Sequence, residues 1–149
     1  MSEPAEVVMA YWRDHRDQLR QSENQRAALT NYVLIIVAAL SGFIVQQQLR
    51  PATIPLAVLI TIIGLFGAVT VAKYHERAAY HLSQARALTR ALVAAGHLPD
   101  HATELDQART THYTRYPRLR RIRLHHLWTG FHLGIALYGA ALTVITATQ

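Results

Sequence analysis

Five arginines within twelve residues form the densest charge in the chain, in the segment RYPRLRRIRLHH at residues 115–126. Guanidinium groups attract phosphates and acidic lipid headgroups, at about 1 kcal/mol for each basic residue near a membrane surface. We therefore expect this segment, together with two cations earlier in the chain, to contact anions or lipid headgroups. The predicted set is Lys73, Arg77, Arg115, Arg118, Arg120, Arg121 and Arg123. A narrower alternative is a cytosolic anion or nucleotide site, with Arg118 and Arg121 on one face and Lys73 or Arg77 nearby.

Nine histidines and no cysteine define the metal chemistry open to the chain. Without cysteine, thiolate metal sites and disulfides are excluded. His97 and His101 are four positions apart, but Pro99 lies between them and Gly96 beside them, so no shared helical face is expected. The segment HERAAYH lacks the spacing of the zinc-protease helix. His132 lies within an apolar stretch near its start, and we expect an interfacial structural residue rather than a ligand. We predict no metal and no cofactor.

Catalysis and nucleic-acid binding find little support in the residue pattern. We see no paired carboxylates, no nucleophile with a neighbouring base and no glycine-rich phosphate loop. The chain is therefore predicted not to be an enzyme. Nucleic-acid binding calls for aromatic residues interleaved with the cations and for a larger soluble surface, so nucleic acid is not an expected partner.

Three stretches almost free of charge, at residues 27–45, 52–72 and 127–147, are long enough to cross a membrane. A helix needs about 20 apolar residues to span a hydrocarbon core of about 30 Å. Polar and charged residues such as Asp14 and Glu23 precede the first stretch, which distinguishes it from a cleaved signal peptide. The sequence therefore predicts an all-α integral membrane protein with three transmembrane helices and long continuous cytosolic helical extensions.

The distribution of basic residues predicts the orientation of these helices. We divide the chain into a cytosolic N-terminal helix (1–26), a transmembrane helical hairpin (27–72), a cytosolic stalk with the basic juxtamembrane segment (73–126) and a third transmembrane helix (127–149). Fourteen of the fifteen Lys and Arg residues lie in the first and third segments, and Arg50 is the exception. The positive-inside rule then places the N-terminus in the cytoplasm and the C-terminus outside a cell inner membrane.

Two long helices are expected to run without interruption from the cytosol into the membrane. Residues 5–41 contain neither glycine nor proline, and the second apolar stretch continues through Lys73 to about Ala95, before Gly96. An unbroken helix would act as a rigid lever, because displacing its cytosolic part also moves its membrane part.

The connections between helices carry their own signals. Pro51 and Pro55 predict a tight turn between the first two membrane helices. Asp100 is expected to cap a short helix at about residues 101–114. Pro117 is expected to open a further helix that leads into the third stretch.

Small and apolar residues recur at three- and four-residue steps along the stalk, a spacing that suits packing against another helix. This seam comprises Ala78, Leu82, Ala85, Thr89 and Leu92, and a looser stripe near the N-terminus comprises Val8, Tyr11, Trp12, His15 and Leu19. We expect the two stripes to pack on each other within one chain, and packing between chains is the alternative.

Small residues four positions apart let membrane helices approach closely. The predicted helix-packing residues are Gly64, Gly67, Ala68, Gly130 and Gly134. They favour a homo-oligomer, although packing within one three-helix bundle fits equally well.

Mild polar residues lie inside the apolar stretches: Asn31, Thr61, Thr70 and His132. Hydroxyl groups from several chains could line a water-filled path, or each could be satisfied by its own helix backbone. The stretches contain no carboxylate, which argues against a proton- or cation-coupled transporter.

The order of these segments suggests a family. A long charged N-terminal helix, a tight transmembrane hairpin and the unbroken extension AKYHERAAYHLSQARAL together resemble the bacterial SLATT-type membrane proteins, which are associated with nucleotide-signalling and SLOG domains. The resemblance covers roughly residues 12–92, rests on layout and the KYHER junction, and transfers no catalytic residue. It implies a helical membrane effector that permeabilises the inner membrane when a partner senses infection. The third apolar stretch and the lack of a visible sensor domain depart from the family.

Two functions are compatible with these features. The first is an oligomeric inner-membrane effector that forms or gates a pore, in antiphage or nucleotide-signalling defence. The second is a non-conducting scaffold or accessory subunit that docks a soluble cytosolic partner through its basic helices. In both, the bilayer with its anionic headgroups is the first partner.

Overall fold

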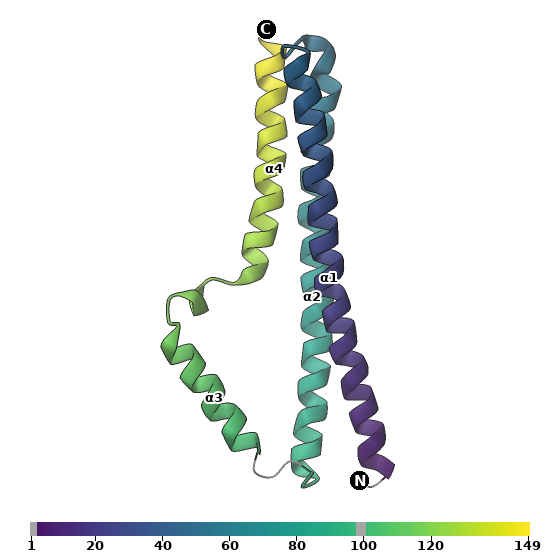
Figure 1. Cartoon of the computed structure of the whole chain (residues 1–149), viewed down its shortest axis with the longest axis vertical. Helices are drawn as coiled ribbons and strands as arrows, with labels where there is room; N and C mark the ends of the chain where they lie inside the picture. Colours follow the sequence, from purple (N-terminus) through teal and green to yellow (C-terminus); the bar gives the residue numbers. More distant parts are fainter. Residues whose placement is uncertain (1–2, 98–100) are drawn as a thin grey trace. The chain divides into compact units, whose positions relative to one another are not determined.

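The structure is a computed structural model that describes residues 3–97 and 101–149. Four α-helices account for most of this part: α1 (Glu3–Gln46), α2 (Ile54–Ala94), α3 (His101–Arg115) and α4 (Leu124–Ala147) (Figure 1). Two short 3-10 turns, η1 (Pro51–Thr53) and η2 (Leu119–Arg121), join them. The described residues contain no strand, so the all-α class is confirmed. The segments Ala5–Gln46, Pro51–Ala94 and Leu124–Ala147 are each long and apolar enough to cross a membrane.

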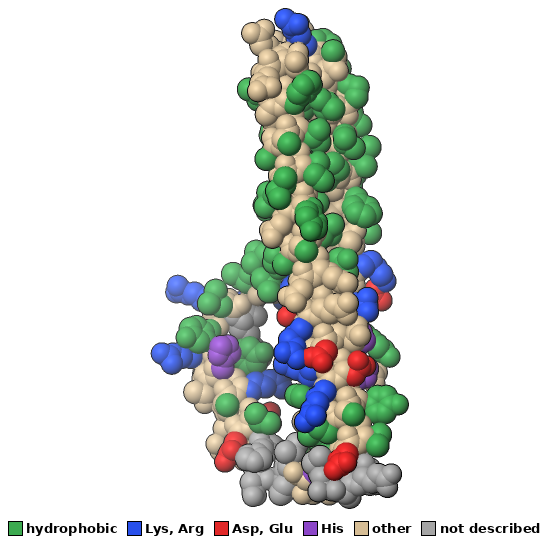
Figure 2. Space-filling view, turned by 45° about the vertical axis from the view of Figure 1, so that its right-hand side comes forward, with side chains coloured by type: hydrophobic (Ala, Val, Ile, Leu, Met, Phe, Trp, Pro, Cys, Tyr) green, Lys and Arg blue, Asp and Glu red, His purple; other side chains and the backbone are tan. Residues whose placement is uncertain are grey.

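The chain divides into two compact units. The charged unit consists of Met1–Glu23 and Glu76–Arg123, and the apolar unit consists of Asn24–His75 and Leu124–Gln149. Helices α1 and α2 contribute to both units, whereas α3 belongs to the charged unit and α4 to the apolar unit. All nine Asp and Glu residues fall in the sequence of the charged unit. Charged side chains accordingly gather over one unit in Figure 2, and apolar side chains cover the other.

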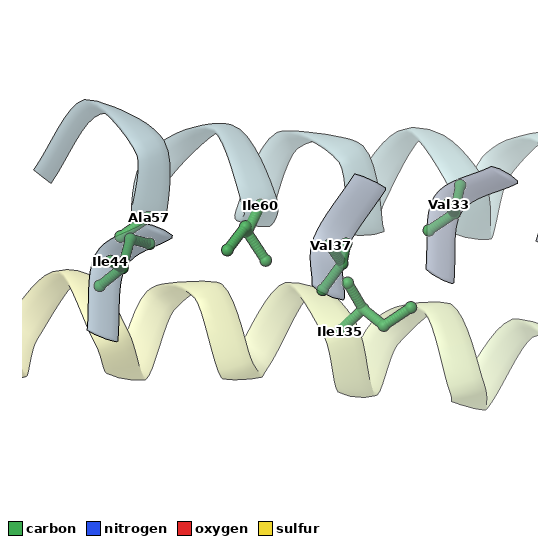
Figure 3. Close-up of a cluster of buried hydrophobic side chains, with 6 residues drawn as sticks. All are labelled: Val33, Val37, Ile44, Ala57, Ile60 and Ile135. Atoms are coloured by element: carbon green, nitrogen blue, oxygen red, sulfur yellow. The ribbon is translucent and has the colours of Figure 1, made fainter. Parts of the chain in front are cut away.

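Aliphatic side chains from three helices fill the interior of the apolar unit (Figure 3). The buried cluster comprises Val33, Val37 and Ile44 of α1, Ala57 and Ile60 of α2, and Ile135 of α4. Each of these side chains is at most 8% exposed. Burial of apolar side chains on this scale holds the three helices together in an aqueous or a lipid surrounding, because close packing supplies dispersion contacts in either.

The outward faces of the same helices are also apolar. Ile35 of α1, Phe66 of α2 and Leu137 of α4 are 65%, 62% and 72% exposed. A helix that is apolar on both its inner and its outer face is typical of a membrane span.

A seven-residue repeat marks the inner face of α2. The repeat comprises Ala57, Gly64, Val71, Ala78, Ala85 and Leu92, and every one of these residues is buried. A strict seven-residue period keeps one stripe facing a partner helix along a left-handed supercoil. The repeat continues from the apolar part of α2 into its charged part without a change of phase.

The turn after α1 is built from two residues with left-handed backbone conformation, Gln48 (φ 54°) and Leu49 (φ 57°). The Leu49 N–H donates to the carbonyl oxygen of Ile44 at 3.2 Å, which closes the helix end as in a Schellman motif. Arg50 is extended, as the residue before a proline prefers, and Pro51 opens η1. At the far end of α2, Gly96 (φ 74°) closes the helix in the same way.

The prediction that Pro117 opens a helix is wrong. Residues 116–118 form no helix, Ile122 is extended, and α4 begins only at Leu124. Arginines at positions 115, 118 and 121 would share one side of a continuous helix and repel one another, and no carboxylate lies within this segment to offset the repulsion. The short preceding helix is present as α3, and its expected cap, Asp100, lies outside the described residues.

Candidate functional site

Polar side chains gather at one end of the apolar unit. The unit extends three residues past each predicted membrane boundary at that end, through residues 24–26, 73–75 and 124–126. We call the contacting residues there the polar layer: Arg26, Thr30, His75, His125, Trp128 and His132. They come from α1, α2 and α4, so the layer joins all three helices of the unit.

Arg26 is a buried cation at the edge of this layer. Its side chain is only 8% exposed, and its guanidinium carbon lies 5.1 Å from the ring centroid of Trp128. The Arg26 Nε and the Trp128 Nε1 are both buried and have no hydrogen-bond partner among the described residues. The apolar unit contains no carboxylate, and Glu23, the nearest one along α1, is exposed. The face of the indole ring stabilises the charge of Arg26.

His132 lies fully enclosed between the helices. Its Nε2 is 3.1 Å from the hydroxyl oxygen of Thr30, and that hydroxyl lies 3.0 Å from the carbonyl oxygen of Arg26. Because the hydroxyl has one proton, which it donates to the carbonyl, it must accept from His132 Nε2–H. The neutral imidazole then carries its proton on Nε2 and leaves Nδ1 as the buried unpartnered atom. The side chain of His132 is enclosed between the helices and does not reach the surface of the unit.

Gly67 provides the space that His132 occupies. A Cβ atom at position 67 would lie 2.7 Å from Cε1 and 2.9 Å from Cγ of the imidazole, and closer still to Nδ1. Any larger residue there would collide with the ring.

Two histidines stack at the same end of the unit. The rings of His75 on α2 and His125 on α4 lie 3.9 Å apart and within 10° of parallel, and His126 lies beside His125. Stacked rings do not direct their nitrogens to a common point. Among the described residues, no group of three His, Cys, Asp or Glu side chains could hold a metal ion.

The predicted small-residue faces lie in two different environments. Gly64 and Gly67 pack against α4, where a Cβ at position 64 would lie 2.7 Å from the Cα of Ala136. Ala68 is also buried. Gly130 and Gly134, by contrast, have no atom within 4 Å of an added Cβ. The close approach from α4 is made instead by Gly139, whose added Cβ would lie 2.5 Å from the backbone nitrogen of Thr61.

The predicted threonines bond within their own helices. The hydroxyl of Thr61 donates to the carbonyl of Ala57, and the hydroxyl of Thr70 to that of Phe66, at 3.3 and 2.8 Å. Asn31 is exposed and lines a groove of about 330 Å³ between α1 and α4. The groove is otherwise lined by Thr30, Leu34, Leu124, Leu127, Trp128 and Phe131.

The predicted basic set is divided between the units. Lys73 belongs to the apolar unit, and the other six residues belong to the charged unit. The side chain of Arg77 bonds across to α1, with its Nη2 3.0 Å from Oε1 of Gln18. Arg115, Arg118, Arg121 and Arg123 are exposed, and the side chain of Arg120 lies outside what the structure describes.

Aromatic and aliphatic side chains lie among these arginines. Arg115 lies over the ring of Tyr116 at 5.8 Å, and His112 contacts the same ring at 5.1 Å. Leu119 and Ile122 are 64% and 54% exposed on a surface hollow of about 490 Å³. Exposed apolar residues alternating with arginines are typical of a segment that lies on a membrane surface.

The two stripes of the charged unit pack on each other within the chain. Ala78, Ala85 and Leu92 of α2 are buried and Leu82 is half-buried. The indole N–H of Trp12 donates to the hydroxyl of Thr89 at 3.0 Å. Of the N-terminal stripe, only Tyr11 points away, with 59% of its surface exposed.

A histidine pair links the same two stripes. The Nδ1 atoms of His15 and His81 lie 3.0 Å apart. Burial lowers the pKa of His81 below its usual 6.5, the charges of His15 and Arg77 lower it further, and Asp14 opposes them. Protonation of both rings would place two cations in contact, so acid conditions should weaken the packing of the two stripes.

Comparison of the chain with family models, with curated proteins and with solved structures finds no match. The site is therefore assigned from its geometry alone.

Sequence interpretation missed Arg26, the His75–His125 stack and Gly139. A usable signal existed for Arg26, because it stands seven residues before Val33 and seven after Leu19, in the same repeat as Trp12. That phase places position 26 on the inner face of α1.

Proposed function

We propose that the chain is a subunit of an oligomeric bacterial inner-membrane protein that permeabilises the membrane. Its N-terminus lies in the cytoplasm and its C-terminus outside. Three helices of sufficient length and apolarity support the membrane location. The aliphatic core of the apolar unit fills the space between them, so any conducting path runs between subunits rather than through one chain.

The uncovered pair Gly130 and Gly134 carries the proposal. Gly64, Gly67 and Gly139 are all in close contact within the chain, but these two glycines of α4 have no atom within 4 Å of an added Cβ. A small-residue face four positions long and free of contacts within the chain suits close approach of a second chain in lipid. Oligomerisation through α4 would bring several copies around a common axis.

The test is to replace both glycines by leucine and to count subunits in mild detergent. Because an added Cβ meets no atom within 4 Å at either site, the fold should survive while the oligomer dissociates. Gly42→Leu is the matched control, since Gly42 of α1 is equally open. Dye-monitored flux in liposomes should disappear with the oligomer. An intact oligomer in the double variant, or no flux from the unsubstituted protein, contradicts the proposal.

The defence role rests on the resemblance of the KYHER junction to SLATT-type proteins. It predicts depolarisation of the host membrane during phage infection and loss of plaque protection in the Gly130/Gly134 leucine variant. Fusions of a cytoplasmic fluorescent reporter to each terminus test the orientation, with signal expected only at the N-terminus.

The surface of α3 supports a second candidate, a non-conducting scaffold for a soluble partner. Every described side chain of α3, from Thr103 to Arg115, is exposed, including Leu105 at 62%. A scaffold would co-purify with a stoichiometric partner and would show no flux after reconstitution.

A further inference from the structure

We propose that Arg26, Trp128 and the groove between α1 and α4 form a binding site for one anionic phospholipid, with its phosphate on Arg26 and an acyl chain along the groove. This inference rests on the membrane insertion within the proposed function, and it does not depend on pore formation.

The polar half of the site follows from two unsatisfied donors. The Arg26 Nε–H and the Trp128 Nε1–H are buried and unpartnered among the described residues, and the guanidinium lies over the indole ring. Both groups can only donate, so their complement is a group that only accepts. A phosphate has this property and carries the negative charge that favours a guanidinium, and the apolar unit contains no Asp or Glu.

The neighbouring unpartnered atom, His132 Nδ1, does not belong to this site. It lies against Gly67, which leaves no space for a ligand.

The apolar half of the site begins at the same indole ring. Trp128 lines the groove of about 330 Å³, and Leu34, Leu127 and Phe131 continue it along the membrane helices. These three side chains are 44%, 57% and 43% exposed, so the groove is open to the hydrocarbon rather than closed as a cavity. Its polar contributions, Thr30 and Asn31, are uncharged. A phosphate next to an open aliphatic groove fits a phospholipid better than a soluble phosphate.

Quenching of Trp128 by brominated lipids tests the proposal. The chain has two tryptophans, so Trp12→Phe leaves Trp128 as the only one. The variant is placed in vesicles in which either phosphatidylglycerol or phosphatidylcholine carries bromine on its acyl chains. At equal mole fraction, the brominated phosphatidylglycerol should compete for the site about fivefold better, the factor that one cation contributes near an anionic surface.

Charge variants identify the cation responsible. Arg26→Gln should reduce the ratio to about one, and Arg26→Lys should restore part of it. Arg50→Gln, in the loop at the other end of the apolar unit, and Arg118→Gln, in the exposed basic segment, should leave the ratio unchanged. An equal effect of all three glutamine variants would mean general attraction of anionic lipid and would overturn the site.

The remaining outcomes separate this site from the membrane proposal. Equal quenching by both headgroups in the protein with Arg26 intact overturns the site but keeps the membrane insertion. No quenching by either lipid overturns the insertion itself. Loss of the headgroup preference on adding millimolar inorganic phosphate would show a soluble-anion site and would overturn the lipid assignment.

Discussion

Substitution of Gly67 by alanine tests the packing of the polar layer most directly. The added methyl carbon would lie within 3 Å of three ring atoms of His132. The imidazole cannot rotate away freely, because it is fully enclosed and its Nε2 bonds to Thr30. The methyl can therefore be accommodated only if α2 and α4 separate or the hydrogen bond breaks.

The magnitude follows from two opposing terms. Overpacking by one methyl group costs about 1–3 kcal/mol. Alanine in place of glycine in a helix interior contributes about 0.8–1.0 kcal/mol in the other direction. Gly42→Ala has the second term without the first, because no atom lies within 4 Å of its Cβ. The unfolding free energies of the two variants should thus differ by the overpacking term, about 1–3 kcal/mol.

Equilibrium unfolding in mixed micelles with increasing dodecyl sulfate, followed by tryptophan fluorescence, measures this difference. His132→Ala should reverse the sign of the Gly67→Ala effect, because the new methyl then fills space that the ring vacates. The expected coupling in the double-mutant cycle is about 1–3 kcal/mol. If Gly67→Ala is as stable as Gly42→Ala, or if the two sites show no coupling, the enclosed histidine is not packed as described.

Two further predictions concern the charged unit and the continuity of α2. The pKa of His81 is lower in the folded chain than in the unfolded chain, so the unfolded chain binds more protons near and below pH 6.5. The free energy of unfolding should therefore fall as the pH decreases through that range, and His81→Gln should flatten this pH dependence. An unchanged pH dependence in that variant would mean that another group causes the effect. Three glycines at positions 72–74 should abolish signal transmission along α2, whereas three alanines there should preserve it. The measurement is membrane depolarisation on activation. Equal depolarisation by the two variants would show that a rigid, continuous α2 is not required.

The long helices could be predicted because their causes are local. The absence of glycine and proline from residues 5–41, the seven-residue repeat of α2 and the glycine after Ala95 are all visible in the sequence. The irregular segment after Pro117 was not predicted, because the rule for a first-turn proline considers one residue, whereas the repulsion among the arginines depends on several.

The polar layer could not be predicted, because it depends on helix rotation. Gly64 with Ala68 and Gly130 with Gly134 have the same spacing, yet only the first pair faces inward. Spacing specifies that two residues share a face, and the rotation of the helix in the bundle decides where that face points. Arg26 was overlooked for a different reason: a cation is assigned to the surface by its type, although its phase in the repeat indicated the interior.

The cations of the apolar unit agree with the dimensions of a bilayer. The unit contains Arg26, Arg50 and Lys73 and no Asp or Glu. On α1, Arg26 stands twenty residues before the last helical residue, Gln46, which corresponds to about 30 Å at 1.5 Å per residue. On α2, the distance from Ile54 to Lys73 is about the same. Because a hydrocarbon core is also about 30 Å thick, cations at both ends of these spans would lie at the two layers of lipid phosphates.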